Sequence, residues 1–87
     1  MSHRRDTVNK TENEDKPVSP ERMLFAKNLK RARIAANLSQ RDVRDRTGFA
    51  QSWVSEIETG KIAPTIDNMA KLANCLGVPL WQLLVPS

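Results

Sequence analysis

The sequence is poor in the residues from which catalytic and metal sites are usually built. Among its 87 residues there is one cysteine, Cys75, and one histidine, His3. A single cysteine excludes an internal disulfide and fits a reducing cytoplasm. No glycine-rich phosphate loop and no metal-ligand spacing occur, so we expect no enzymatic activity, no cofactor and no bound metal. Cys75 stands in an apolar stretch and is expected to be a small, half-buried hydrophobic residue.

Long hydrophobic runs are also missing. No run of about 18 apolar residues exists, and no signal-peptide core, so we expect a cytoplasmic protein that neither spans a membrane nor is secreted. A chain of 87 residues allows one small domain, which buries only about 60% of the surface of its unfolded chain. We therefore expect no second, ligand-sensing domain.

The charge of the chain is unevenly distributed. Residues 1–20 carry four basic and four acidic side chains, so the formal charge of +4 belongs to residues 21–87. Residues 22–46 hold eight of the basic side chains against two acids, Asp42 and Asp45. Such a block suggests contacts with phosphates, although a solvated helix face explains it equally well on its own.

The first eighteen residues are polar, with mixed charge and few aliphatic side chains. They cannot bury enough apolar surface to order themselves, so residues 1–18 are expected to be a flexible tail. A second interpretation is that Arg4 and Arg5 form a basic arm that enters a minor groove.

Start and stop signals predict only helices in the remainder, residues 19–87. Ser19, followed by a proline and an acid, can cap a helix that runs to about Asn37. A second such helix begins after Thr65 and ends at Gly77. A short last helix is expected from Leu80 to Val85. The helix after Ser19 is expected to bury a face made of Phe25, Leu29, Ala32 and Ala36. The helix after Thr65 is expected to bury a face made of Ile66, Met69, Ala70, Leu72, Ala73 and Leu76.

Between these helices, the stretch from Gln40 to Gly60 predicts two short helices joined by a tight turn. Ser39 and Asp42 have the spacing of a capping box, and Gly48 can adopt the left-handed backbone that ends a helix. The two helices are expected at about residues 40–47 and 50–59. The exposed face of the second would display Gln51, Ser52, Ser55 and Glu56. This is the layout of a helix-turn-helix whose second helix reads base edges.

The chain resembles the XRE, or lambda-repressor-like, helix-turn-helix regulators of bacteria and phages over roughly residues 25–84. The resemblance rests on the joint spacing of Leu29, Arg33, Leu38-Ser39-Gln40, Val43, Gly48-Phe49, Val54-Ser55, Ile57-Glu58, Gly60, Pro64, Leu72-Ala73, Leu76-Gly77-Val78 and Leu83-Leu84. It implies a compact, all-α, five-helix DNA-binding domain. The implied function is that of a sequence-specific transcriptional regulator that binds double-stranded DNA.

The resemblance also implies roles for individual residues. Gln51, Ser52, Ser55 and Glu56 would read bases, with Gln40 bracing Gln51. The implied phosphate contacts are Ser39, Gln40, Arg41, Thr59 and Lys61. Trp53 could pack near the first helix, stack on sugar or methyl groups, or cover core, and we expect it to pack against the backbone side of the DNA interface. Arg33 and Glu58 would form a structural ion pair. The chain departs from the usual pattern at Arg44, Thr47, Ala50 and Trp53.

We expect a homodimer, because one small module makes few base contacts and a twofold-symmetric pair doubles them. The expected interface consists of Leu80, Trp81 and Leu84, with Trp81 as the anchor. The expected activity is repression of its own or a neighbouring gene. The alternative is an antitoxin or another module of this fold whose main partner is a protein, such as a toxin.

Overall fold

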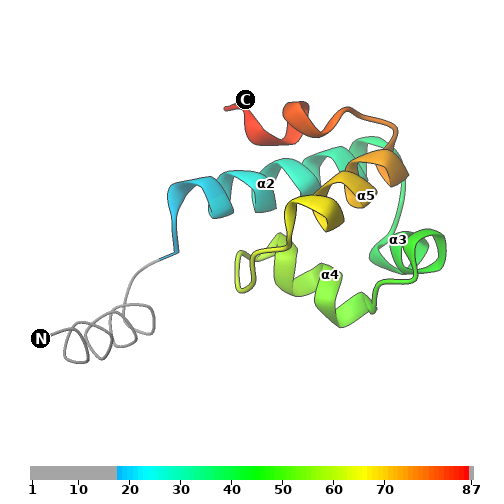
Figure 1. Ribbon diagram of the computed structural model, residues 1–87. Coiled ribbons are helices and arrows are strands. Elements are labelled where there is room, and N and C mark those ends of the chain that lie inside the picture. The colour runs from blue at the N-terminus through cyan, green and yellow to red at the C-terminus, as the bar shows by residue number, and fades with distance from the viewer. Residues whose placement is uncertain (1–17, 87) are drawn as a thin grey trace, which may run out of the picture.

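The computed structural model describes residues 18–86, which are all-α. The elements are α2 (Pro20–Ala35), α3 (Gln40–Thr47), α4 (Gln51–Glu58), α5 (Ile66–Leu76) and the 3-10 helix η1 (Leu80–Leu84) (Figure 1). No strand and no helix able to cross a membrane occur within this range. The expected tail and its two arginines, Arg4 and Arg5, lie outside the described residues, apart from Val18.

Three helices start where the sequence places a capping side chain. The Ser19 hydroxyl accepts from the Arg22 N–H at 3.1 Å, and the Thr65 hydroxyl accepts from the Asn68 N–H at 3.2 Å. At α3 both halves of the predicted capping box are present, because the Ser39 N–H also donates to Asp42 at 2.8 Å. That hydrogen bond holds the pKa of the Asp42 carboxyl below its ordinary value. The predicted starts are confirmed.

Glycines in the left-handed conformation end α3 and α5. Gly48 has a φ of +82° and Gly77 a φ of +74°, as the sequence predicted for a helix stop at each. Gly60 has a φ of +79° and turns the chain after α4. A Cβ on Gly60 would overlap the sulfur of Met23, whereas a Cβ on Gly48 would meet nothing. Met23 of α2 therefore packs directly on the turn that follows α4.

Gly48 and Gly60 allow the cost of backbone strain to be measured separately from the cost of a packing clash. Gly48→Ala is expected to cost about 1–2 kcal/mol of unfolding free energy, because an L-residue resists this φ. Gly60→Ala should cost up to about 1 kcal/mol more, since the exposed end of the Met23 side chain must also move. Urea unfolding measures both. In a chain that already carries Met23→Ala, Gly60→Ala should cost no more than Gly48→Ala does. A larger cost in that chain would mean that the excess does not arise from the contact with Met23.

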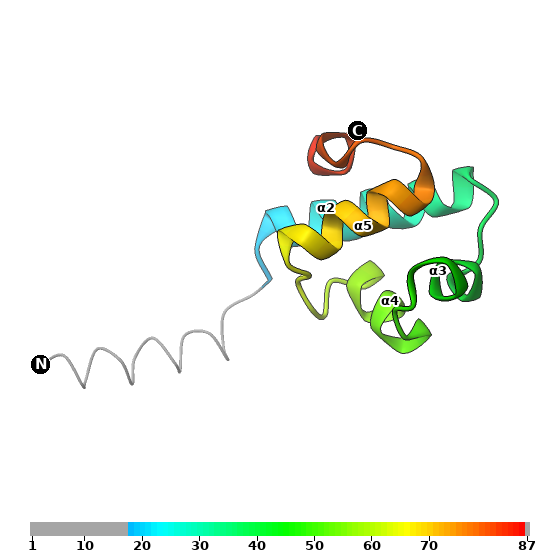
Figure 2. The ribbon, with the colours of Figure 1, turned by 45° about the vertical axis from the view of Figure 1, so that its right-hand side comes forward.

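The helices form two groups, as Figures 1 and 2 show from two directions. α2, α5 and η1 lie together, and α3 and α4 pack against each other beside them. α2 and α5 are the central elements, since α2 contacts α4, α5 and η1 while α5 contacts α2, α3 and η1. Two-turn helices such as α3 and α4 are marginal alone, so this scaffold must hold them in place.

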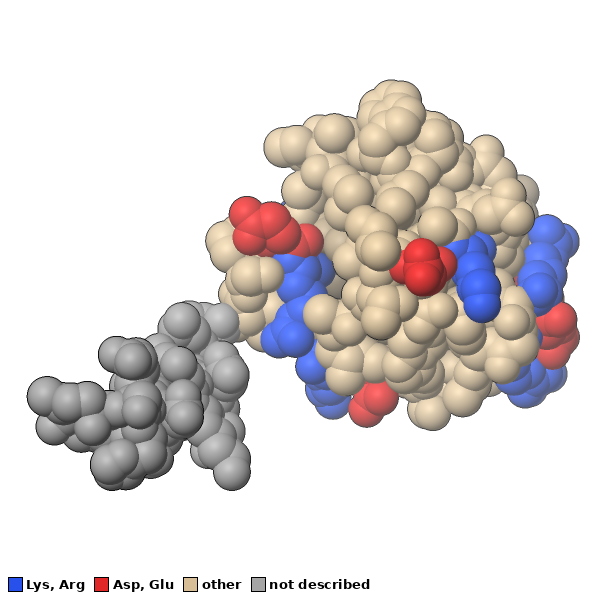
Figure 3. Space-filling model, viewed as in Figure 1, with Lys and Arg blue, Asp and Glu red and all other residues tan. Residues whose placement is uncertain are grey.

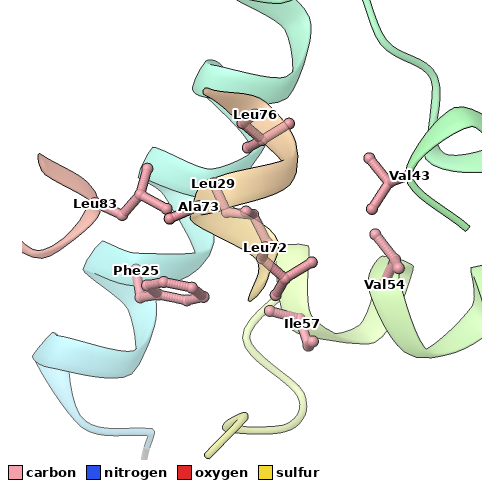
Figure 4. Packing of buried hydrophobic residues seen from close by; sticks show 9 residues of the cluster. All are labelled: Phe25, Leu29, Val43, Val54, Ile57, Leu72, Ala73, Leu76 and Leu83. Carbon is pink, nitrogen blue, oxygen red and sulfur yellow. The ribbon is translucent and has the colours of Figure 1, made fainter. Parts of the chain in front are cut away.

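One hydrophobic core joins all five elements. Val43 of α3 and Val54 of α4 face each other in Figure 4, beside Ile57 and Leu72. The buried hydrophobic cluster consists of Phe25, Leu29, Val43, Val54, Ile57, Leu72, Ala73, Leu76 and Leu83. The motif helices are therefore fixed to the scaffold by apolar contacts on one side, which leaves their other side open.

The structure differs from the sequence-based expectations in three places. α2 ends at Ala35, before Asn37 with its φ of +59°. The last helix is a 3-10 helix of five residues, Leu80–Leu84, and prolines stand immediately before and after the segment 80–85. Ile66 is 62% exposed, and Ala36 and Ala70 are also exposed, so the apolar faces are narrower than expected.

Candidate nucleic-acid interface

The turn between α3 and α4 is fixed by a threonine. The Thr47 hydroxyl donates to the Val43 carbonyl at 2.7 Å and accepts from the Phe49 N–H at 3.1 Å. It thereby bridges the end of α3 to the first residue after Gly48. Thr47 is one of the departures from the family pattern, and the structure gives it this local role.

The exposed face of α4 carries the polar residues that the sequence singled out. Gln51, Ser52 and Glu56 are exposed and Ser55 is half-buried, while Val54, Ile57 and Glu58 are buried. Ala50 precedes the helix and supplies no side-chain cap. The first N–H groups of α4 are therefore open to an outside acceptor.

A buried ion pair ties α4 to α2. Arg33 donates from Nε to Glu58 Oε2 at 2.6 Å and from Nη2 to Oε1 at 3.1 Å. The two side chains are 12% and 2% exposed. Arg33 also donates to the Leu38 carbonyl at 2.8 Å, at the entry to α3. One arginine thus contacts both α4 and the segment that leads into α3.

Gln40 takes part in the same network. Its Nε2 donates to Glu58 Oε1 at 3.1 Å, where the family resemblance implied a contact with Gln51. The half-buried Gln40 is the first residue of α3, so its side chain joins the N-terminus of α3 to the end of α4. A bond from Gln40 to Glu58 was not among the expectations from sequence.

The residues expected to contact phosphates lie at both ends of the motif. Ser39 and Arg41 are exposed at the start of α3, and Thr59 and Lys61 are exposed after α4. The Thr59 hydroxyl already donates to the carbonyls of Ser55 and Glu56, at 3.2 and 3.1 Å, and its oxygen still has room to accept.

Trp53 is partly buried and packs against Phe49 with the ring centroids 4.7 Å apart. Its indole therefore stands at the edge of the core, on the flank of α4, rather than free in solvent. Arg44, another departure from the pattern, is directed outward and pairs with Asp45 at 2.9 Å. It does not enter the contact between α3 and α4.

A second surface, formed by the C-terminal part of the chain, carries no charge. Residues 72–87 contain no Asp, Glu, Lys or Arg. The upper part of the molecule in Figure 3, where η1 lies in Figure 1, accordingly shows neither basic nor acidic side chains. Trp81 is 65% exposed and Leu84 is 40% exposed, while Leu80 is half-buried.

Asn28 was not singled out from the sequence, and it attaches η1 to α2. This buried side chain donates to the carbonyls of Leu83 and Val85, at 3.0 and 2.8 Å.

Cys75 is half-buried, as expected, and burial raises the pKa of its thiol. No group of three or more His, Cys, Asp or Glu side chains in residues 18–86 could hold a metal ion.

Comparisons with known proteins agree with this geometry. The helix-turn-helix family model matches residues 29–80. The chain is 36% identical over 66 residues to an uncharacterized HTH-type transcriptional regulator, y4dJ, of Sinorhizobium fredii, covering 76% of this chain and 86% of that protein.

Two crystal structures are similar to the chain. One is the hypothetical transcription factor NHTF from Neisseria, with a TM-score of 0.72, 30% identity and 76% coverage of each chain. The other is the restriction-modification controller protein C.AhdI from Aeromonas hydrophila, with a TM-score of 0.70 and 28% identity, covering 75% of this chain and 98% of that one. The chain belongs to the XRE-type helix-turn-helix family of DNA-binding transcriptional regulators.

Proposed function

We propose that this protein is a homodimeric repressor that binds a twofold-symmetric operator with α4 in the major groove. The observation that carries the proposal is the division of α4 into two faces. Its buried face packs on the core through Val54 and Ile57, and its open face holds only polar side chains at the base-reading positions. A rigidly held helix with such a face suits direct readout of base edges.

Each polar side chain on this face has a chemistry that can select a base. Gln51 can donate and accept at once, which matches adenine N6 and N7. Glu56 can accept from cytosine N4, and it repels phosphate at a wrongly placed site. Ser52 and Ser55 have short hydroxyls that bond to several bases and add less selectivity.

The proposed phosphate contacts position α4 in the groove without selecting sequence. Arg41 and Lys61 supply full charges, and Ser39 and Gln40 supply neutral donors beside them. The Thr59 hydroxyl can donate to a phosphate only by leaving the carbonyls that it now bonds. The uncapped N–H groups at the start of α4 favour an anion, whereas the N-terminus of α3 already holds the Asp42 carboxylate of its capping box. Trp53 is proposed to pack its indole edge against the sugar-phosphate backbone.

The function is tested by selecting binding sites from random duplex DNA with the full chain. The selected site is expected to consist of two inverted half-sites whose centres lie about one DNA turn apart. Fluorescence anisotropy should then show a preference of roughly a thousandfold or more over scrambled DNA. Equal, weak binding to both duplexes that vanishes with salt would refute sequence-specific recognition. Transcription from a promoter that contains the site would show repression.

Two substitutions separate base reading from phosphate binding. Gln51→Ala is expected to lose about 1–3 kcal/mol of binding free energy and to relax preference at one base pair of each half-site. Lys61→Ala should weaken all duplexes alike and reduce the slope of log K against log salt by about 0.9 for each phosphate that is no longer neutralised. Anisotropy titrations on single-base operator variants measure both. Equal loss of specificity in both variants would contradict the assigned roles.

A further inference from the structure

An apolar cavity of about 190 Å³ opens beside the charge-free C-terminal surface. Its apolar lining comes from four parts of the chain: Phe25 of α2, Ala63 and Pro64 of the loop before α5, Met69 of α5, and Leu84 of η1. A cavity of about 150 Å³ with such a lining binds benzene in another protein, so this cavity has room for an aromatic ring.

The cavity also contains a donor that lacks a partner. Arg22 lines it, and the Arg22 Nε–H is buried without an acceptor anywhere in residues 18–86. Buried N–H groups are almost always paired, so an unpaired one indicates a missing acceptor. Ser19 and Glu21 line the cavity as well, so its apolar part adjoins a polar edge at the start of α2.

The geometry of η1 relates the cavity to Trp81. Trp81 and Leu84 are three residues apart, and side chains at that spacing lie one above the other on a 3-10 helix. Because Leu84 lines the cavity, Trp81 projects from the same side of η1, about 6 Å along the helix axis. Trp81 is 65% exposed and is the largest exposed apolar side chain of the described chain.

We infer that in the homodimer Trp81 of each subunit fills the cavity of the other. This inference rests on the homodimer of the proposed function and specifies its contact. In a twofold-symmetric dimer a projecting ring and a cavity on one side of η1 make two equivalent, reciprocal contacts. Residues 72–87 bring no charge of their own to this interface, and its charged side chains are Glu21 and Arg22 beside the cavity.

Two variants and their mixture test this contact. Trp81→Ala removes the ring, and Ala63→Leu, at an exposed loop position, fills the cavity. Each full-chain variant should dimerise at least about 30-fold more weakly than the wild type, as expected for an interface anchor. In an equimolar mixture the intact ring of the Ala63→Leu chain can enter the intact cavity of the Trp81→Ala chain. Heterodimers should therefore exceed the half of all dimers that random pairing gives, as native mass spectrometry measures.

The control is Gln82→Ala. Gln82 is exposed on η1 and does not line the cavity, so this substitution should leave dimerisation unchanged. Thermal unfolding of each chain verifies that it is folded. A wild-type dimer whose two variants show no preference for heterodimers would overturn the inference and leave the homodimer standing. So would an Ala63→Leu chain that dimerises as tightly as the wild type. A wild-type chain that stays monomeric, both free and on the selected operator, would refute the proposed homodimer itself.

Discussion

Glu58→Ala is expected to lower the free energy of unfolding by about 3–5 kcal/mol, because it leaves the charge of Arg33 buried without its partner. The Glu58 carboxylate accepts three hydrogen bonds, two from Arg33 and one from Gln40. Removing it leaves Arg33 Nε and Nη2 without acceptors on a side chain that is only 12% exposed. Equilibrium unfolding in urea, with the m value checked against the wild type, measures the loss.

The matched control is Glu56→Ala, two residues earlier on the same helix and exposed. It removes the same charge but no buried partner, so it should change stability by less than about 0.5 kcal/mol. Replacing both members of the pair, Arg33→Met with Glu58→Leu, should recover most of the stability, because no buried charge is then left alone. Equal losses from Glu58→Ala and Glu56→Ala would mean that the pair does not hold α4.

This ion pair also matters for the orientation of the recognition helix. Arg33 contacts Glu58 at the end of α4 and the Leu38 carbonyl just before α3, so it relates the two motif helices to α2. In the chain that carries both Arg33→Met and Glu58→Leu, apolar packing alone would set the orientation of α3 and α4 relative to α2. We therefore expect its DNA-binding specificity to fall more than its stability does, since apolar contacts fix helix orientation less sharply than paired hydrogen bonds.

The features that could be predicted from sequence are those with a local physical cause. Ser39 caps α3 because a short oxygen-bearing side chain reaches N–H groups three residues away, and both partners lie within one turn. Gly48 and Gly77 are in the conformation that only glycine adopts at low cost. The polar face of α4 follows from helix periodicity, which sets which residues share a side.

The features that sequence reasoning missed depend on contacts between distant segments. Gln40 bonds to Glu58, eighteen positions away, and Ile66 is exposed because α5 buries a narrower face than its composition suggested. Asn28 was overlooked because nothing in its neighbourhood marks it as different from any polar helix residue. Its partners are the carbonyls of Leu83 and Val85, 55 and 57 positions further along the chain.

Asn28→Ala is the second substitution with a large expected effect, a loss of about 2–4 kcal/mol in unfolding free energy, because two main-chain carbonyls lose their donor. The Leu83 carbonyl belongs to η1, whose five residues are too few to stand without support. Asn28 is thus the polar attachment of η1 to α2, alongside the apolar contacts of Leu83 in the core. Urea unfolding measures the loss of stability.

The same substitution should also weaken dimerisation, although Asn28 does not line the cavity that we propose for Trp81. Trp81 and Leu84 both lie on η1, so when η1 loses its attachment to α2, neither the indole of Trp81 nor the cavity wall formed by Leu84 is held in position. The matched control is Asn74→Ala on α5, an exposed asparagine whose loss should affect neither property. Stability and dimerisation should fall together in Asn28→Ala. A chain that loses stability and still dimerises like the wild type would mean that the dimer itself holds η1 in place.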